Sequence, residues 1–231
     1  LRNASPSFDH WLGTDKMGRD IFVRILFGAR ISLAVGCLAA VINLIVGTIY
    51  GGIAGYVGGK VDMIMMRVVD IIYSVPSMLY IVLIMLIFGA SVVSIMLGIS
   101  ITCWIDMARI VRQQVKSLKE QEFTMAAFVL GAGSSRILLK HLLINTMGQI
   151  IVTVTLMVPQ AIFTEAWLSF LGVGISAPMA SWGTLAQDAR ELIMTYPMQT
   201  VYPMIAICIT IFSFNFVGEG LEKALDPKRK R

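Results

Sequence analysis

The stretch from Ile31 to Gly59, ISLAVGCLAAVINLIVGTIYGGIAGYVGG, runs for 29 residues without Asp, Glu, Lys, Arg or His. A helix that crosses a bilayer needs about 20 mostly apolar residues, because the hydrocarbon layer is roughly 30 Å thick. This stretch therefore predicts a transmembrane helix. The rest of the 231-residue chain agrees, since 14% of it is charged and 57% is hydrophobic, whereas about a quarter of a soluble domain is charged. The composition excludes a soluble enzyme domain and predicts an all-α polytopic membrane protein.

Three further charge-free blocks follow: Ile71–Ile105, Leu142–Thr164 and Leu192–Gly218. The first of them would be about 50 Å long as a single helix, which exceeds the bilayer. A turn at Phe88-Gly89-Ala90-Ser91 divides it, so we expect two spans, Met63–Phe88 and Val92–Arg112, and five spans in all. Pro76 and Pro159 lie inside predicted spans and are expected to kink them.

The segment Ala166–Gln187 is also free of charge, but residues that break helices interrupt it. These are Gly172, Gly174, Pro178, Ser181 and Gly183. Irregular backbone is not tolerated in contact with lipid, so we expect an outer loop or re-entrant segment over residues 166–197.

Basic residues predict the orientation. Linkers on one side of the five spans contain thirteen Lys and Arg, and the opposite linkers contain one, Arg190. Because Lys and Arg concentrate in short cytoplasmic loops, the C-terminus is expected inside. Residues 1–30 then form an extracytoplasmic segment, and residues 31–231 form the transmembrane domain. Since the chain begins at Leu1 rather than Met, we expect that a first span precedes it in a longer polypeptide.

Small residues mark one face of the first span. Gly47, Gly51 and Gly55 recur every four residues, a spacing that lets another backbone approach closely. The partner helix belongs either to this chain or to a second subunit, and the sequence leaves both alternatives open.

Few ionisable residues fall deep in the spans, where they are costly and often functional. Asp106 and Glu165 are the two candidates, and each lies near a predicted interface. For Glu165, beside Trp167, we expect an interfacial anchor or, alternatively, a part in the translocation path. Arg67 and Asp70 are three residues apart and could pair on one helix face.

The longest internal cytoplasmic segment, residues 113–141, predicts a helix, a glycine turn and a second helix. Glu122–Leu130 favours helix, Gly131-Ala132-Gly133 stops it, and Ser134 or Ser135 can cap a helix over Arg136–Leu143. Its small residues Ala126, Ala127 and Gly131 would permit close approach of another protein. An ordinary amphipathic interfacial helix is the alternative.

This segment resembles the "EAA" loop of the permease subunits of bacterial ABC importers. Met125-Ala126-Ala127 and Gly131 match its Glu-Ala-Ala and glycine positions, and Arg136 lies in the second half of the loop. The resemblance implies that residues 113–141 form the loop that couples this chain to an ATPase, with Met125, Ala126, Ala127, Gly131 and Arg136 as the coupling residues. Met125 replaces the acidic residue and Ile144 the usual distal proline, which puts a salt bridge through position 125 in doubt.

Other motifs resemble the dipeptide/oligopeptide/nickel branch of these permeases, in the same order along the whole chain. They are His10-Trp11-Leu12-Gly13-Thr14-Asp15, Gly18-Arg19-Asp20, Gly28-Ala29-Arg30-Ile31-Ser32-Leu33, Ala54-Gly55-Tyr56, Met66-Arg67-Val68-Val69-Asp70, Leu168-Ser169-Phe170-Leu171-Gly172, Ser181-Trp182-Gly183, Gly218-Glu219-Gly220-Leu221 and Ala224-Leu225-Asp226-Pro227.

The resemblance implies the second, C-type permease of a type I ABC importer, which has six spans in the family. It further implies a multi-pass protein of the bacterial plasma membrane that forms half of a path for di- or oligopeptides. The implied partners are a second homologous permease, two cytoplasmic ATPases and an extracytoplasmic substrate-binding protein, with no nucleic acid. The chain would not be an enzyme and would hold no cofactor, since ATP and Mg would be bound by the ATPases; the sequence has no G-x-x-x-x-G-K-[ST] motif.

Two alternatives remain from the sequence. A permease of the same branch could carry nickel or another small solute. A stand-alone secondary transporter is the more distant alternative, disfavoured by few buried charges and no visible inverted repeat. A membrane-embedded enzyme is disfavoured because His10 and His141 lie on opposite predicted sides.

Overall fold

A computed structural model describes residues 2–175 and 179–225, and helices dominate this part of the chain. Within the described residues, the only β-type pairing is an isolated bridge between Thr14 and Asp20. The helices are α1 (Ile21–Ile42), α2 (Thr48–Val57), α3 (Gly59–Tyr73), α4 (Ser77–Phe88), α5 (Val92–Thr102), α6 (Trp104–Lys119), α7 (Glu122–Val129), α8 (Ser134–Arg136), α9 (Ile144–Leu168), α10 (Trp182–Ala189) and α11 (Pro197–Leu225).

Several of these helices join end to end into longer rods. The four that are long and apolar enough to cross a membrane are Ile21–Val57, Val92–Lys119, Ser134–Val173 and Pro197–Leu225. The pair α3 and α4 makes a fifth span if it is counted as one, although the two helices are bent by 71°. The five spans expected from the sequence are therefore found when α3 and α4 are counted as one broken span.

The first rod begins ten residues earlier than the charge-free stretch suggested, which corrects the start expected at Ile31. Asp20 caps the helix by accepting a hydrogen bond from the Val23 amide at 2.8 Å. The charged Arg24 is accommodated because its guanidinium forms an ion pair with Asp15 at 2.8 Å. Counting charge-free residues finds the apolar part of a helix but not its capped polar end.

The bend between α3 and α4 lies at Pro76, as the sequence predicted. Proline lacks an amide hydrogen and restricts the residue before it, so the helix ends at Tyr73 and starts again at Ser77. The break separates helices of 15 and 12 residues, which places it near the middle of the broken span. The other proline, Pro159, lies inside α9, which continues through it.

The segment expected as an outer loop is more helical than predicted. The rod that contains α9 extends to Val173, where Gly172 adopts a φ of +89° and the helix stops. Residues 182–189 then form α10, which packs against α9, α11 and α1 without crossing the bundle. Pro178, which the sequence assigned to a turn, lies outside the described residues.

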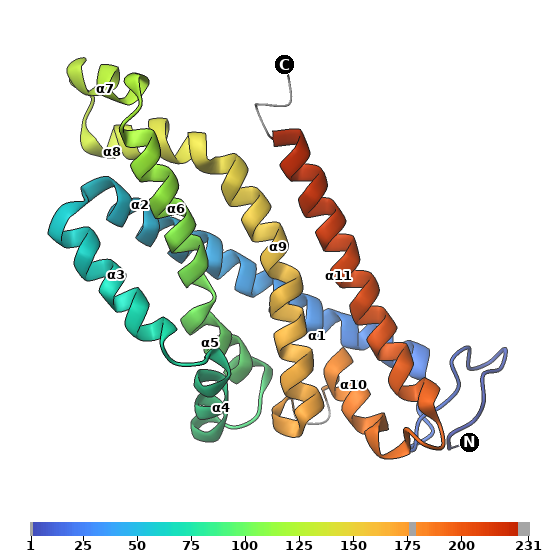
Figure 1. Cartoon of the computed structure of the whole chain (residues 1–231). Helices are drawn as coiled ribbons and strands as arrows, with labels where there is room; N and C mark the ends of the chain where they lie inside the picture. Colours follow the sequence, from blue (N-terminus) through green and yellow to red (C-terminus); the bar gives the residue numbers. More distant parts are fainter. Residues whose placement is uncertain (1, 176–178, 226–231) are drawn as a thin grey trace.

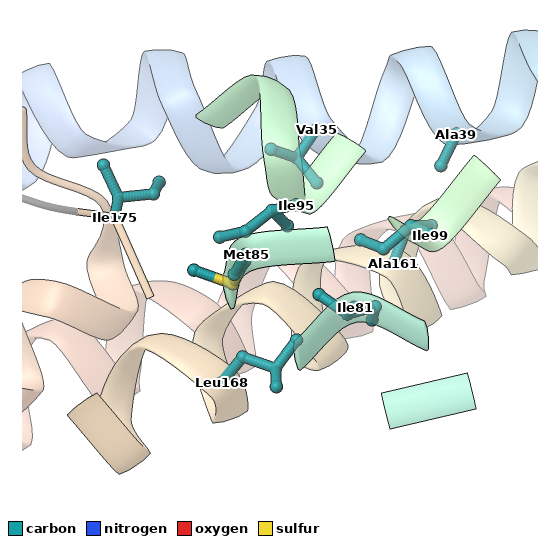
Figure 2. Packing of buried hydrophobic residues seen from close by; sticks show 9 residues of the cluster. All are labelled: Val35, Ala39, Ile81, Met85, Ile95, Ile99, Ala161, Leu168 and Ile175. Carbon is teal, nitrogen blue, oxygen red and sulfur yellow. The ribbon is translucent and has the colours of Figure 1, made fainter. Parts of the chain in front are cut away.

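The rods pack into a bundle with two distinct ends (Figure 1). One end has α7, α8, the α2–α3 turn and the end of α11, and the other has the N-terminal segment, α10 and the α4–α5 turn. The core cluster lies among α1, α4, α5 and α9, as Figure 2 shows. Its members are Val35, Ala39, Ile81, Met85, Ile95, Ile99, Ala161, Leu168 and Ile175.

The outer surface of the bundle is apolar. On α11 the side chains of Ile209, Phe212 and Phe216 are all more than half exposed, which would be costly in water but is the normal state of a lipid-facing helix. This surface fits a lipid bilayer.

Candidate functional site

The helix α7 stands outside the bundle, at the end of the molecule that also has the end of α11 (Figure 1). It ends in a Schellman motif, in which the Ala132 amide donates to the Ala127 carbonyl and the Gly131 amide to the Phe128 carbonyl, both at 3.0 Å. Gly131 supplies the positive φ of +80° that this motif needs. The glycine turn predicted from the sequence is confirmed.

The start of the second helix of this segment differs from the prediction. It begins at Ser134, after Gly133 as the cap residue, and no side-chain hydrogen bond caps it. The capping role expected of Ser134 or Ser135 is therefore wrong. Arg136, the last residue of α8, is exposed.

The two neighbouring alanines of α7 differ in burial. Ala127 is 8% exposed, and Thr124 beside it donates a hydrogen bond to the Leu118 carbonyl at 2.8 Å. Ala126 and Gly131 are exposed, and the Met125 side chain is 56% exposed. The small-residue surface expected from Ala126 and Ala127 together is thus split, and Ala126 alone faces outward.

The free face of α7 is apolar, and a cavity of about 710 Å³ lies beside it. Phe128 is 72% exposed, and Val129 and Leu130 are more so. The cavity is bounded by α7 together with Tyr56 and Val57 at the end of α2 and by the start of the following rod. Apolar side chains exposed in a small patch with a hollow beside it are typical of a protein contact surface.

Charged side chains of α6, the helix before α7, bind the end of α2 and the start of α3. The Asp62 side chain is 7% exposed, and its carboxylate accepts hydrogen bonds from both the Nε and Nη2 atoms of Arg112, the second at 2.6 Å. Lys116 Nζ lies 3.1 Å from the same carboxylate, and Lys119 Nζ donates to the Tyr56 carbonyl at 2.6 Å. Since only residues 120 and 121 separate α6 from α7, these contacts lie close to the start of α7.

Contacts inside the chain also fill the glycine face of the first rod. A methyl group added at Gly51 would lie 2.2 Å from the Ala108 carbonyl oxygen, and one at Gly47 would lie 2.6 Å from the Met107 Cβ. At Gly55 the nearest atom would be the Arg112 carbonyl oxygen at 2.7 Å. Of the two partners left open by the sequence, the structure therefore selects α6 of this chain, and the seam with a second subunit is not formed by these glycines.

A cavity of about 470 Å³ lies beside the break between α3 and α4. Its lining comes from three rods, Ile21–Val57, Val92–Lys119 and Ser134–Val173, together with residues 73–77 at the break and Ile81 of α4. The polar groups that reach it include Asn43, Ser74, Asp106, Gln160 and Thr164. Non-helical backbone at membrane depth is tolerated where it lines a cavity, and this is the arrangement found at the break.

Sequence reasoning missed most of this lining, although signals existed. Asn43 and Gln160 are amide side chains inside long apolar stretches, and Gln160 directly follows Pro159. Asp106 is one of the two ionisable residues that the sequence places within predicted spans, and it lines the cavity. What the sequence did not reveal is that these positions, far apart in the chain, face one another.

Glu165 takes part in a network of hydrogen bonds between helices. It is 0% exposed, and its carboxylate accepts hydrogen bonds from Ser32 Oγ at 3.1 Å and Ser169 Oγ at 2.8 Å. Ser32 Oγ in turn accepts one from the Trp182 amide at 3.2 Å. Glu165 is absent from the lining of the 470 Å³ cavity. It is buried and connects α1, α9 and α10 through these hydrogen bonds; its expected interfacial or translocation-path role stays a prediction.

Ion pairs tie the N-terminal segment to α10. Arg24 contacts both Asp15, at 2.8 Å, and Asp188, at 3.1 Å. Burial disfavours the ionised form of Asp15, but hydrogen bonds from the Arg19 amide and side chain and from the Met17 amide outweigh it, so the pKa of Asp15 lies below its ordinary value. A hydrogen bond from the Val23 amide lowers the pKa of Asp20 in the same way.

The neighbouring pair expected between Arg67 and Asp70 does not form. Asp70 instead contacts Arg109 of α6 at 3.0 Å. The Arg109 guanidinium also lies 4.4 Å from the centre of the Tyr73 ring.

Comparison with known proteins gives the family. Residues 47–231 match the family model described as "Binding-protein-dependent transport system inner membrane component". The chain is 53% identical to the oligopeptide transport system permease protein OppC of Bacillus subtilis, over all of the chain and 76% of that protein. It is 48% identical to the dipeptide transport system permease protein DppC of the same organism, over all of the chain and 72% of that protein.

Solved structures show the same fold. The inward-facing MetNI methionine ABC transporter matches with a TM-score of 0.71 at 17% identity, over 89% of this chain and 98% of the other. An amino acid ABC transporter crystallised with histidines matches with a TM-score of 0.68 at 14% identity, over 88% of this chain and 94% of the other. The fold is that of an ABC importer transmembrane domain, and the chain is a multi-pass membrane protein that belongs to the family of binding-protein-dependent transport system inner membrane components.

Proposed function

We propose that this chain is a permease subunit of an ATP-driven importer for di- or oligopeptides, with its C-terminus in the cytoplasm. It pairs with a second homologous permease to enclose the path, receives cargo from an extracytoplasmic binding protein, and docks two cytoplasmic ATPases. ATP and Mg are bound by those ATPases. The identity of 53% and 48% to oligopeptide and dipeptide permeases supports a peptide cargo.

The observation on which this proposal rests is the connection from α7 to the break at Pro76. The exposed face of α7 offers a binding surface for an ATPase. The ion pair between Asp62 and Arg112 joins α3 to α6. The far end of α3 is the break that lines the 470 Å³ cavity. A displacement of α7 by a nucleotide cycle would therefore reach the wall of the path without any intervening flexible loop.

Packing beneath α7 supports the same route. Ile137 and Leu142, in the rod that follows α7, are buried against Val111 and Val115 of α6. Interiors packed in this way transmit strain rather than absorb it. The helices on either side of α7 are consequently packed against each other, so a force on α7 would act on both of them.

A co-purification experiment tests the ATPase contact. We expect Ala126→Arg to abolish co-purification of the ATPase and ATP-driven peptide uptake, because a long cation would be placed on the outward face of α7. Ala127→Arg would be a poor test, since Ala127 is buried and the variant would disturb the fold.

The matched control is Ala90→Arg, the same exchange at an exposed residue in the α4–α5 turn at the opposite end of the molecule. It should keep both the ATPase and the uptake. Elution volume and thermal unfolding in detergent show whether each variant is folded. If a folded Ala126→Arg variant retains the ATPase and the uptake, α7 is not the coupling surface.

Cargo is tested separately, by uptake of labelled di- and tripeptides and of nickel into proteoliposomes that contain the whole complex. Saturable, ATP-dependent uptake of peptides is the expected result. Uptake of nickel in place of peptides would overturn the peptide assignment and leave the coupling assignment intact.

A further inference from the structure

The cavity beside the α3–α4 break presents hydrogen-bond acceptors. Asn43 lines it but is 1% exposed, and its Nδ2 atom contacts Met157 Sδ. Its Oδ1 atom, which has no hydrogen-bond partner among the described residues, is enclosed rather than open to the cavity. The acceptors open to a bound molecule are the oxygen atoms of the other polar lining residues.

A negative charge lies at the same cavity. Asp106, in the first turn of α6, contributes to the lining and forms no ion pair with any described residue. Arg109 lies one turn further along α6 and could neutralise it, but Asp70 and the Tyr73 ring hold the Arg109 guanidinium. Asp106 is exposed, and a carboxylate within a candidate span that has no ion-pair partner marks a site for a positive group.

The other lining groups are neutral. Ser74, Ser77, Thr102, Gln160 and Thr164 offer hydroxyl and amide groups, which can accept from and donate to a peptide bond. Ala39, Ile81, Ile99 and Ala161 form an apolar floor shared with the core cluster of Figure 2. A volume of about 470 Å³ falls within the range of small-molecule sites.

We propose that this cavity binds the free α-ammonium group of a peptide in transit, with Asp106 as its counter-charge and the neutral polar groups of the lining as further acceptors. The proposal rests on the peptide import proposed above and assigns to the permease itself a part in recognising the cargo. An ammonium has three donors and no acceptor, which complements a carboxylate with hydroxyl and amide oxygens beside it. A peptide with a blocked amino terminus offers no charge and fewer donors.

Thiol labelling tests the charge preference of the cavity independently of transport. Thr102 lines the cavity, one turn before Asp106, so Thr102→Cys in a Cys37→Ser/Cys103→Ser/Cys208→Ser background gives one reporter. The purified complex with the partner permease and ATPases is treated with trimethylammonium-ethyl or sulfonatoethyl methanethiosulfonate. Relative to a free thiol, the cationic reagent should react faster by about tenfold, because a cleft of one charge sign concentrates counter-ions.

Asp106→Asn should abolish this preference. The matched control is Glu222→Gln, which neutralises an exposed carboxylate near the end of α11 and should leave the preference unchanged. The tripeptide Ala-Ala-Ala should slow labelling of the reporter, and N-acetyl-Ala-Ala-Ala should slow it less. If the reporter shows no cationic preference, or if Asp106→Asn retains it, the proposal is overturned.

Uptake gives the second measurement. In proteoliposomes with the complete importer, Asp106→Asn should lower the maximal uptake rate of Ala-Ala-Ala by about tenfold, the loss expected for one charge-assisted contact of ~1.4 kcal/mol. The concentration of loaded binding protein that half-saturates ATP hydrolysis should not change, since docking is elsewhere, and Asp106→Glu should restore most of the rate. Unchanged uptake in a folded Asp106→Asn variant overturns this inference, whereas absence of uptake in the wild type overturns the proposed function instead.

Discussion

The Asp62 carboxylate accepts a hydrogen bond of 2.6 Å from Nη2 of Arg112, fifty residues further along the chain. A second bond from Arg112 Nε makes the contact bidentate, and the Asp62 side chain is 7% exposed. This pair joins the start of α3 to the helix that leads into α7. It lies on the direct route from the exposed coupling surface to the break at Pro76.

We expect Asp62→Asn to uncouple ATP hydrolysis from uptake. Removing one charge from a largely buried pair leaves the other without its partner, at a cost of about 2 kcal/mol once the 30% exposure of Arg112 is allowed for. The variant should lower the midpoint of thermal unfolding and reduce the peptide taken up per ATP hydrolysed.

A double-mutant cycle with Arg112→Gln separates the pair from other effects, because the double variant should lose little more than either single variant. Additive losses would show that Asp62 and Arg112 act independently. Lys60→Gln is the control for charge removal near the same turn, since Lys60 is exposed.

We expect Gly51→Ala and its neighbour Gly52→Ala to have opposite effects on stability. The Gly51 methyl would meet the Ala108 carbonyl at 2.2 Å, whereas the nearest atom to the Gly52 methyl is the Leu143 Cδ2 at 3.6 Å, an ordinary contact. Overpacking costs about 1–3 kcal/mol, and an unstrained Gly→Ala change in a helix gains about 0.5–1 kcal/mol. Thermal unfolding in detergent measures both.

Equal stability of the two variants would contradict the direct α2–α6 contact. If Gly51→Ala weakened association with the partner permease and left stability unchanged, the glycine face would instead be the contact with the second subunit.

The attachment of the N-terminal segment should depend on pH. Because Asp15 has a lowered pKa in the folded chain, its ionisation stabilises the fold fully above its ordinary pKa of 3.8. This contribution is lost as the pH falls through the lower folded value. Hydrogen exchange over residues 2–20 should therefore be slow and constant from pH 7 down to about pH 4, after correction for the intrinsic rate, and faster below it.

Asp15→Asn should raise exchange in the segment at pH 7 and remove its acid dependence. Asp9→Asn changes an exposed carboxylate of the same segment and should alter neither. If residues 2–20 exchange as slowly in Asp15→Asn as in the wild type, the ion pair between Asp15 and Arg24 does not hold the segment in place.

Much of the fold could be predicted from the sequence because its signals are local. Length and apolarity locate the rods, Pro76 locates the break, and Gly131 locates the end of α7. The helix ends were less accurate, since Asp20 extends α1 by capping and by supporting Arg24, effects that hydropathy does not register.

The site was harder to predict because its parts are distant in the chain. In an eight-residue helix with large apolar side chains on more than one face, the sequence does not reveal which of the adjacent Ala126 and Ala127 is buried. Ser32 and Glu165 are 133 residues apart, and nothing local to Glu165 indicates the hydroxyls that surround it. The same holds for Asn43 and Asp106, whose common cavity exists only once α1, α6 and α9 are packed.

Glu165 should hold α10 in place. Its carboxylate binds Ser32 and Ser169, and the Trp182 amide at the start of α10 donates to the same Ser32 hydroxyl. Glu165→Ala would leave two buried serine hydroxyls without their acceptor, at a cost of about 1–3 kcal/mol. Amides of residues 182–189 should then exchange roughly tenfold faster or more, because each 1.4 kcal/mol of opening free energy corresponds to a factor of ten.

Two further variants separate the carboxylate from the packing around it. Glu165→Gln keeps one acceptor oxygen and should show a smaller increase in exchange, and Glu191→Ala, which changes an exposed carboxylate beyond α10, should show none. Close packing is the competing explanation, because a methyl group added at Gly183 would lie 2.5 Å from the Ala166 carbonyl oxygen. If α10 in Glu165→Ala exchanges as slowly as in the wild type, this backbone contact is sufficient to hold the helix, and the buried carboxylate is not its anchor.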